Sequence, residues 1–226
     1  MNFEGKTVMV TGGAGNLGQA LAEAFSASGA NMVLLDVKSG GNEKGLFILT
    51  DLLDQKSVDA AAAKAIERFG RIDVLCNIAG GFRMGAPLHE TSDEDWNFLF
   101  DTNVRTVLHT ARAVVPRMLA AGGGKIINVG AFAAQKGAAQ MAAYTASKSA
   151  VIRLTEAMAA ELRGKGINVN CVLPTVIDTP QNRSAMPKAD PNKWVAPQNL
   201  AQTVAFLASD DARDIHGAAV PVTGLS

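Results

Sequence analysis

The segment that decides the fold is residues 6–18, with the sequence KTVMVTGGAGNLG. It begins as a short β-branched run and turns at Gly12 and Gly13, and from Asn16 onward apolar residues recur at helical spacing. A strand, a glycine-rich turn and a helix in this order are typical of a phosphate-binding turn. Glycine lets the backbone approach a pyrophosphate, and the helix offers free N–H groups. An acidic residue, Asp36, ends the next apolar run about 20 residues further on, as this fingerprint requires.

Apolar runs and helical segments alternate along the rest of the chain, which predicts a parallel sheet covered by helices on both faces. The expected strands cover residues 6–11, 31–36, 46–50, 73–76, 125–129, 167–173 and 218–222. The expected helices cover residue 16 up to a stop at 29, and residues 57–69, 93–119 and 142–163. The sequence therefore predicts one α/β domain over residues 1–226, a doubly wound, Rossmann-type sheet of seven parallel strands. Residues 37–45 are too short for the usual helical crossover, so we expect an irregular loop there.

The composition argues against several classes of protein. The 226 residues carry 21 Lys+Arg and 21 Asp+Glu, and this balance is unlike the basic excess of a nucleic-acid binder. The chain has neither an apolar run long enough to span a membrane nor the features of a secretory leader at residues 1–10. Cys76 and Cys171 lie in apolar runs, as expected for buried thiols of a cytoplasmic protein. The three histidines show no metal-ligand spacing, so we expect no metal site.

A tyrosine and a lysine form a candidate catalytic pair. Tyr144 is the only tyrosine of the chain, and Lys148 follows one helical turn later, on the same face of the expected helix 142–163. The pKa of a phenol, about 10, is too high for easy proton transfer at neutral pH. A lysine ammonium one turn away, together with a positive nicotinamide ring, would lower this pKa. The pair predicts a general acid–base for a carbonyl or imine beside a hydride donor.

Asp36 decides which dinucleotide is expected. A carboxylate at the end of the second strand accepts hydrogen bonds from ribose hydroxyls and repels a 2′-phosphate. This predicts NAD(H) in preference to NADP(H), and Lys38 nearby works against that preference.

On these motifs the sequence resembles the short-chain dehydrogenase/reductase family over essentially its whole length. Residues 51–52 (DL) resemble the family's acidic pair at the adenine, and residues 76–80 (CNIAG) its Asn-Asn-Ala-Gly element. Residues 174–179 (PTVIDT) resemble its Pro-Gly-x3-Thr segment, in which the last threonine holds the carboxamide. The resemblance implies these cofactor-binding residues: Gly12, Gly15, Asn16, Leu17, Gly18, Asp36, Asp51, Leu52, Asn77, Ala79, Gly80, Tyr144, Lys148, Pro174 and Thr179.

The resemblance also assigns catalytic roles and an assembly. Tyr144 would exchange the proton, Lys148 would tune it and bind the nicotinamide ribose, and Asn103 would support a proton-relay water. Helices 93–119 and 142–163 form the oligomer interface in this family, so we expect a homodimer or homotetramer.

One departure from the family leaves the substrate open. Ala131 stands where members usually carry a catalytic serine, 13 residues before the tyrosine. Loss of one donor aimed at a developing oxyanion typically costs about 10²–10³ in rate. The chain is therefore a weak ketone reductase, a non-catalytic NAD(H)-binding sensor or scaffold, or an enzyme whose substrate needs no serine.

The third alternative has a parallel within the family. Dihydropteridine reductases also have alanine at this position and a short link between the second and third strands, and their segment after the sixth strand resembles residues 173–194. Their quinonoid pterin accepts hydride readily, whereas Asn103 resembles the corresponding residue of the ordinary carbonyl-reducing members.

Residues 180–197 are expected to form a mobile lid over the substrate. Two further residues are candidates for substrate contact: Arg83 is either a ligand for an acidic or pterin-like substrate or a solvated loop residue, and Trp194 either stacks on a flat ring or packs the lid.

Overall fold

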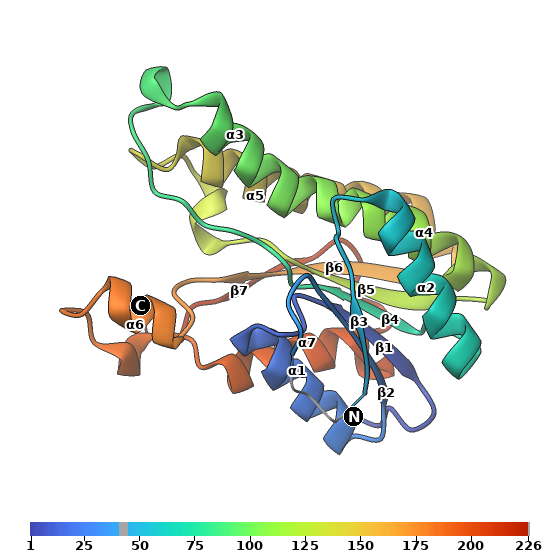
Figure 1. Cartoon of the computed structure of the whole chain (residues 1–226). Helices are drawn as coiled ribbons and strands as arrows, with labels where there is room; N and C mark the ends of the chain where they lie inside the picture. The colour runs from blue at the N-terminus through green and yellow to red at the C-terminus, as the bar shows by residue number, and fades with distance from the viewer. Residues whose placement is uncertain (41–44, 226) are drawn as a thin grey trace.

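The computed structural model describes residues 1–40 and 45–225, which form a parallel sheet with helices on both faces (Figure 1). The strands are β1 (Thr7–Thr11), β2 (Asn31–Asp36), β3 (Leu46–Leu49), β4 (Val74–Asn77), β5 (Gly124–Val129), β6 (Ile167–Pro174) and β7 (Ala219–Val222). They form a seven-stranded sheet in the order β3-β2-β1-β4-β5-β6-β7, and every neighbouring pair is parallel. The predicted doubly wound, Rossmann-type sheet is confirmed. The strand order reverses between β1 and β4, where such sheets bind ligands.

Alternating side chains of the strands contribute to two hydrophobic layers, one on each face of the sheet. The helices are α1 (Asn16–Ala27), α2 (Gln55–Phe69), α3 (Asp93–Phe100), α4 (Thr106–Ala120), α5 (Ala142–Leu162), α6 (Pro180–Ala185) and α7 (Pro197–Ala208). Val8 and Val10 of β1 pack in the layer between the sheet and helices α1 and α7, whereas Met9 packs in the layer between the sheet and helices α2 and α4. Figure 1 shows α1 and α7 below the sheet and α2, α4 and α5 above it. Since side chains alternate along a strand, one apolar run supplies both layers.

Two helix starts follow their sequence signals. The Asp54 side chain accepts a hydrogen bond from the Lys56 amide and caps α2, so this helix begins two residues before the expected start. The Ser92 side chain accepts from the Asp95 amide and caps α3, and the first turn of α3 is acidic, as expected.

The predicted helix 93–119 is interrupted in the structure. A π-helical turn, η2 (Asp101–Arg105), separates α3 from α4 and holds the buried Asn103. A π turn accommodates one more residue than an α turn, so it changes the direction in which Asn103 points relative to a regular helix. The helix α7 was not predicted at all, although its buried Leu200, Val204 and Leu207 recur at helical spacing.

The short connection between β2 and β3 falls partly outside the described residues, which exclude 41–44. Residues 37–40 contain neither helix nor strand, in agreement with the predicted loop. The pairing itself is confirmed, since Val33 aligns with Leu46 and Asp36 with Leu49 in parallel register.

Within the described parts of the chain, no helix combines the length and the apolar character that crossing a membrane requires.

Candidate active site

The glycine-rich turn lies between β1 and α1 at the carboxyl edge of the sheet. Gly12 has a φ of 69°, a conformation that side chains other than glycine rarely adopt. A Cβ atom at Gly13 would lie 2.8 Å from the Leu34 Cβ, and one at Gly18 would overlap the Gly12 carbonyl oxygen. Gly15 is the N-cap of α1, and no side chain caps this helix. The free N–H groups of its first turn therefore fit the pyrophosphate of a dinucleotide.

Asp36 at the end of β2 reaches back to the glycine-rich turn. Its carboxylate accepts hydrogen bonds from the Ala14 amide at 3.0 Å and the Lys38 amide at 3.1 Å. The carboxylate thus lies beside the phosphate-binding turn, where the fingerprint requires the acidic group for the ribose. Only the backbone of Lys38 is engaged by this bond, and its side chain remains exposed.

Two predicted cofactor residues turn their side chains into the interior. The Asn77 amide donates to Asn128 Oδ1 at 2.9 Å and accepts from the Thr110 hydroxyl at 2.8 Å, so it ties β4 to β5 and α4. Leu52 is buried, and its carbonyl lies 2.8 Å from His109 Nδ1. Both side chains complete the packing between the sheet and α4, and the predicted contact of these two residues with the dinucleotide stays a prediction.

The neighbouring cofactor candidates lie at the ends of strands or in the segments that follow them. Thr11 Oγ1 accepts from the Ala79 amide at 3.1 Å and so joins the first turn to the segment after β4. Asp51 Oδ1 accepts from the Leu53 amide in the turn that precedes α2. Pro174 is the last residue of β6.

Lys148 and Tyr144 lie one turn apart in α5, where Lys148 is buried and Tyr144 is half-buried. Lys148 Nζ donates to the Val129 carbonyl at 2.9 Å, and burial lowers its pKa to about 8. Burial raises the Tyr144 pKa to about 12, because a low dielectric disfavours the phenolate. This direction is opposite to the lowering expected where the Lys148 ammonium and a nicotinamide ring both lie beside the phenol, and that lowering stays a prediction.

Asn103 joins the loop after β4 to α5. Its side-chain amide donates to the Gly81 carbonyl at 3.1 Å and accepts from the Gly81 amide at 2.8 Å. The same Nδ2 donates to Ser147 Oγ at 3.0 Å. A Cβ atom at Gly80 would lie 2.9 Å from Asn103 Oδ1 and 3.0 Å from Lys148 Nζ. The structure thus brings Asn103, Lys148 and the loop after β4 together.

The comparisons with known proteins agree with this geometry. Residues 6–190 match the model of the family described as short chain dehydrogenase. The chain belongs to the short-chain dehydrogenase family. Members of this family are NAD(P)-dependent oxidoreductases, and this chain is one of them.

The matched relatives and structures span nearly the whole chain. It is 36% identical to D-threitol dehydrogenase of Mycolicibacterium smegmatis, over 98% of this chain and 93% of the relative. It is 32% identical to the 3-oxoacyl-acyl-carrier-protein reductase of Escherichia coli, over 99% and 98% of the two chains. The NAD+-bound xylitol dehydrogenase structure superposes with a TM-score of 0.90 at 28% identity, over 99% of this chain and 100% of the other.

Ala131 is part of the apolar surface on which the candidate catalytic tyrosine packs. It is 4% exposed and belongs to an apolar cluster on which Val104 and Tyr144 pack. The position of the usual serine hydroxyl is therefore occupied by a methyl group in an apolar wall. A substrate oxygen beside Tyr144 would receive no hydrogen bond from this residue.

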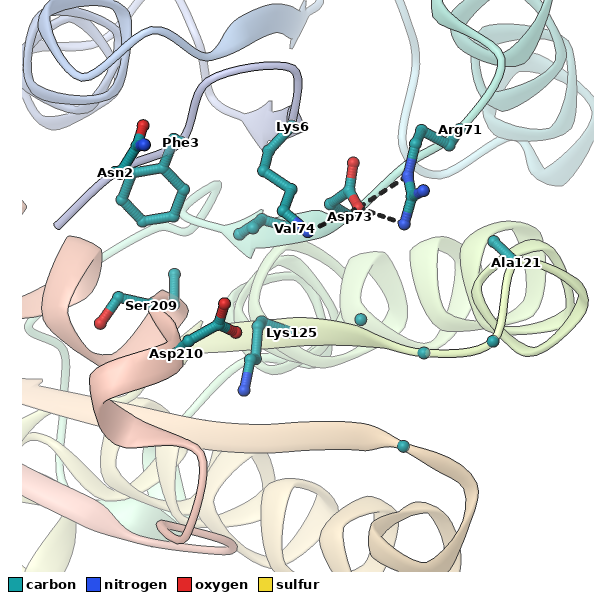
Figure 2. Close-up of a pocket in the computed structure, with 15 residues that line it drawn as sticks. Asn2, Phe3, Lys6, Arg71, Asp73, Val74, Ala121, Lys125, Ser209 and Asp210 are labelled. Carbon is teal, nitrogen blue, oxygen red and sulfur yellow. Dashed lines mark hydrogen bonds and ion pairs between the residues drawn. The ribbon is translucent and has the colours of Figure 1, made fainter.

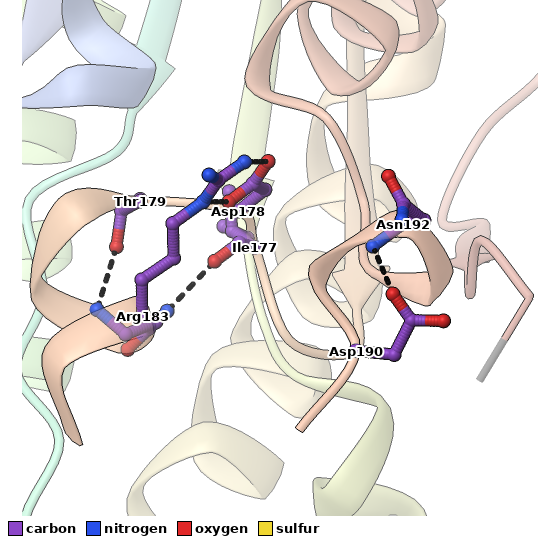
Figure 3. Close-up of polar contacts among 7 residues, drawn as sticks. Ile177, Asp178, Thr179, Arg183, Asp190 and Asn192 are labelled. Atoms are coloured by element: carbon purple, nitrogen blue, oxygen red, sulfur yellow. Dashed lines mark hydrogen bonds and ion pairs between the residues drawn. The ribbon is translucent and has the colours of Figure 1, made fainter. Parts of the chain in front are cut away.

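The segment after β6 forms two short helices. Thr179 Oγ1 accepts from the Asn182 amide at 3.1 Å and caps α6. Arg183 donates to both oxygens of Asp178, at 2.6 and 2.7 Å, and these hydrogen bonds lower the pKa of the carboxyl (Figure 3). Asp190 caps the second helix, η5 (Pro191–Lys193), by accepting from the Asn192 amide. The segment predicted to form a lid is thus held by hydrogen bonds between residues two to five positions apart, and it ends where α7 begins.

The substrate roles of Arg83 and Trp194 stay predictions, and the structure places both side chains. Arg83 pairs with Asp95 at 2.5 Å and lies 3.9 Å above the Phe98 ring, so its guanidinium is engaged by α3. The acidic first turn of α3 accounts for this orientation. Trp194 is half-buried, and a Cβ atom at Gly224 would lie 3.1 Å from its carbonyl oxygen, which places its backbone beside the C-terminal tail.

Two contacts at the site were not predicted. Ser147 Oγ donates to the Tyr144 carbonyl at 2.8 Å, and the Phe82 ring packs on the Tyr144 ring. The spacing of Ser147, three residues after Tyr144 on the same helix face, was an available signal for the first contact. Nothing in the sequence signals the second, because it joins two segments that lie far apart in the chain.

A cavity of about 200 Å³ lies at the opposite, amino edge of the sheet (Figure 2). Its charged lining residues are Lys6, Arg71, Asp73, Lys125 and Asp210. Arg71 Nε lies 2.8 Å from the Asp73 carboxylate, and Lys6 Nζ lies 3.8 Å from it. The helices α4 and α7 end at this cavity, so the cations compensate negative helix ends. In the described parts of the chain, no group of three or more His, Cys, Asp or Glu residues is arranged to hold a metal ion.

Proposed function

We propose that this chain transfers a hydride between NAD(H) and a small carbonyl, alcohol or conjugated imine. The observation that carries this proposal is the convergence of Asn103, Lys148 and Tyr144 beside the loop after β4. These side chains lie at the carboxyl edge of the sheet, to which the glycine-rich turn also belongs. The names of the relatives and of the similar structure refer to threitol, xylitol and 3-oxoacyl compounds, which supports an alcohol or carbonyl as the reacting group.

The residues of the site have separable roles in this proposal. The free N–H groups of the first turn of α1 hold the pyrophosphate, Asp36 holds the adenosine ribose, and Lys148 and Thr179 hold the nicotinamide end. The bound dinucleotide supplies or accepts the hydride. Tyr144 gives its phenolic proton to the oxygen or nitrogen of the acceptor during reduction, and takes one back during oxidation. Hydride and proton together convert a C=O or C=N bond into CH–OH or CH–NH.

Asp36 supports NAD(H) as the preferred dinucleotide. Its carboxylate lies beside the turn that receives the phosphates, so a 2′-phosphate on the adenosine ribose would meet a negative charge there.

A second candidate substrate is a quinonoid dihydropterin. Ala131 favours it, because the apolar wall beside Tyr144 offers no hydroxyl to a localised oxyanion. An electron-poor conjugated ring spreads the developing charge and depends less on such a donor.

We also propose a cytoplasmic homodimer or homotetramer. Trp96 on α3 and Leu108 on α4 are 39% and 40% exposed, and such apolar side chains are available for subunit contact. The free, buried Cys76 and Cys171 are compatible with a reducing compartment. Sedimentation of the purified protein and fractionation of the source cells test these two statements.

Substitution of Tyr144 by Phe tests the proposed proton transfer. We expect turnover to fall by at least about 10²-fold, because a general acid contributes about 10²–10⁴ to the rate. NADH affinity should stay within a few-fold of the wild-type value, since the ring remains. NADH consumption is measured with polyols, ketones and quinonoid dihydropterin, and binding is measured by calorimetry. Unchanged turnover in the Tyr144→Phe variant contradicts the proposal.

The Ala131→Ser variant separates the candidate functions in the same assays. If the introduced hydroxyl raises turnover of ketones by roughly tenfold or more and leaves turnover of the pterin unchanged, reduction of a ketone needs this hydrogen-bond donor and reduction of the pterin does not. Turnover of the pterin by the wild-type protein, unchanged in this variant, supports the second candidate. NADH binding with no turnover of any substrate in either protein supports a non-catalytic sensor or scaffold instead.

A further inference from the structure

The Tyr144 ring is held between two apolar surfaces. One is the cluster that contains Ala131, against which the ring packs together with Val104. The other is the Phe82 ring, whose centroid lies 4.8 Å from that of Tyr144 at an interplanar angle of 85°. An edge-to-face pair of this kind has a preferred geometry, unlike a general apolar contact. The orientation of the Tyr144 ring thus depends on a residue of the loop after β4.

This loop is fixed immediately before Phe82. Asn103 hydrogen-bonds both the amide and the carbonyl of Gly81, at 2.8 and 3.1 Å. A Cβ atom at Gly81 would lie 2.9 Å from the Phe98 ring, so the backbone at this point is also pressed against α3. With Gly81 held on two sides, the position of the next Cα is set, and Phe82 is directed toward Tyr144.

The same amide reaches the helix that carries the tyrosine. Asn103 Nδ2 donates to Ser147 Oγ at 3.0 Å, and Ser147 Oγ donates to the Tyr144 carbonyl at 2.8 Å. A second link lies farther along the loop, where the Gly85 amide donates to the Gln140 carbonyl at 2.9 Å, just before α5. Gln140 has a φ of 60°, an unusual value for a residue other than glycine. The loop and the start of α5 are therefore joined on both sides of the ring contact.

We propose that Phe82 is a positioning residue that fixes the plane of the Tyr144 ring and shields its phenol from water. The role rests on the proposed function of Tyr144 as the proton donor. It compensates for Ala131, because a hydroxyl at that position would otherwise share in orienting the reacting groups. Phe82 is itself 57% exposed, so its side chain contributes little to the buried core. Its contact with Tyr144 is therefore better explained by positioning of the tyrosine than by core packing.

The electrostatic surroundings agree with shielding as the dominant effect on the phenol. Burial is the cause of the raised Tyr144 pKa. Lys148, on the same helix, directs its ammonium to the Val129 carbonyl, and Arg83, beside Phe82, is paired with α3. The titratable or charged groups on the elements around the ring include Lys148 on α5, Arg83 on the loop, Glu94 and Asp95 on α3, and Cys171 on β6; α5 also carries Arg153, Glu156 and Glu161 farther along the helix, and α3 also carries Asp93.

The single tyrosine of the chain makes a direct test possible, because phenolate absorbance reports Tyr144 alone. In the cofactor-free wild-type protein, phenolate should appear only at the upper end of the pH range in which circular dichroism shows a folded chain. In Phe82→Ala the apparent pKa should fall toward the ordinary value of about 10, since water reaches the phenol. Phe82→Trp keeps an aromatic ring and should restore the high value. Phe206→Ala, at a 41% exposed phenylalanine of α7, is the matched control.

Turnover provides the second readout. We expect kcat of Phe82→Ala to fall roughly 10- to 100-fold with NADH affinity unchanged, because a misoriented acid lowers the rate of the chemical step. Phe82→Trp should recover most of this loss, and Phe206→Ala should match the wild type. A Tyr144 titration and a kcat that are both unaffected by Phe82→Ala overturn the proposal. If no substrate turns over, the titration still decides whether Phe82 shields Tyr144, independently of the proposed function.

Discussion

Both edges of the central sheet carry charged side chains, yet only the carboxyl edge carries the groups that the proposed catalysis requires. At the carboxyl edge, β1 runs through glycines into the uncapped start of α1, and Asp36 lies beside that turn. At the amino edge, Lys6, Arg71 and Lys125 line the cavity described above. The first edge presents helix starts with free N–H groups, whereas helices end at the second and their carbonyl groups point outward.

The difference shows that volume and charge alone do not identify a site. The cations of the amino edge are engaged within the fold: Arg71 pairs with the buried Asp73, and Lys125 Nζ donates to Asn168 Oδ1 at 2.8 Å. Burial lowers the pKa of Lys125. The polar groups of the carboxyl edge instead surround a tyrosine and a lysine whose pKa values are both strongly shifted.

The largest expected effect that separates the edges comes from Asp36. We expect Asp36→Asn to weaken NADH binding roughly 10- to 100-fold, because hydrogen bonds to a charged group are worth about 1.5–3 kcal/mol. NADPH binding should weaken less, since the repulsion of its 2′-phosphate is also removed. Calorimetry with both dinucleotides measures the two changes. Asp214→Asn is the matched control, because Asp214 is 92% exposed and lies near the amino edge. Equal losses in the two variants would remove the distinction between the edges.

Substitution of Arg71 is expected to have a smaller effect, on the stability of the fold and not on dinucleotide binding. Arg71→Met removes the nearest cation from the buried Asp73 carboxylate, and the Thr7 amide at 2.9 Å and Lys6 remain its partners. The free energy of unfolding should fall by about 1–2 kcal/mol, between the values of exposed and buried ion pairs. NADH affinity should change by less than about twofold, because distant sites act independently. Chemical denaturation and calorimetry measure these quantities, and a large loss of NADH binding would show that the amino edge participates in function.

Much of the fold followed from the sequence because the decisive signals are local. Apolar runs separated by helical segments give a parallel sheet, and each expected strand has an observed counterpart. The turn at residues 11–18 also carries its own signal, since glycines between a strand and a helix have few other uses. The helix α7 has no counterpart among the predicted helices although Pro197 occupies its first turn, a common helix start, and the predicted lid ends at that proline.

The parts of the site that were not predicted depend on contacts between distant segments. Helical spacing placed Asn103 within a long helix but does not reveal the π turn that aims it at Gly81. Arg83 was recognised as a loop residue, but its partner Asp95 belongs to the next helix, and the pairing depends on how the two pack. The spacing of Tyr144 and Lys148 predicts a lowered phenol pKa beside a nicotinamide ring, whereas burial of the phenol raises its pKa. The balance between charge and burial follows only from the three-dimensional environment.

The most direct test of the central claim is the ionisation of Tyr144 in the presence of saturating NAD+. If the phenol lies beside the bound nicotinamide, the positive ring should stabilise the phenolate. The apparent pKa, read from tyrosinate absorbance, should then fall from about 12 in the free protein to below the ordinary value of about 10. Calorimetry under the same conditions establishes that NAD+ is bound. A Tyr144 pKa that stays unchanged while NAD+ is bound would contradict the account, because the candidate proton donor would then lie away from the reacting carbon.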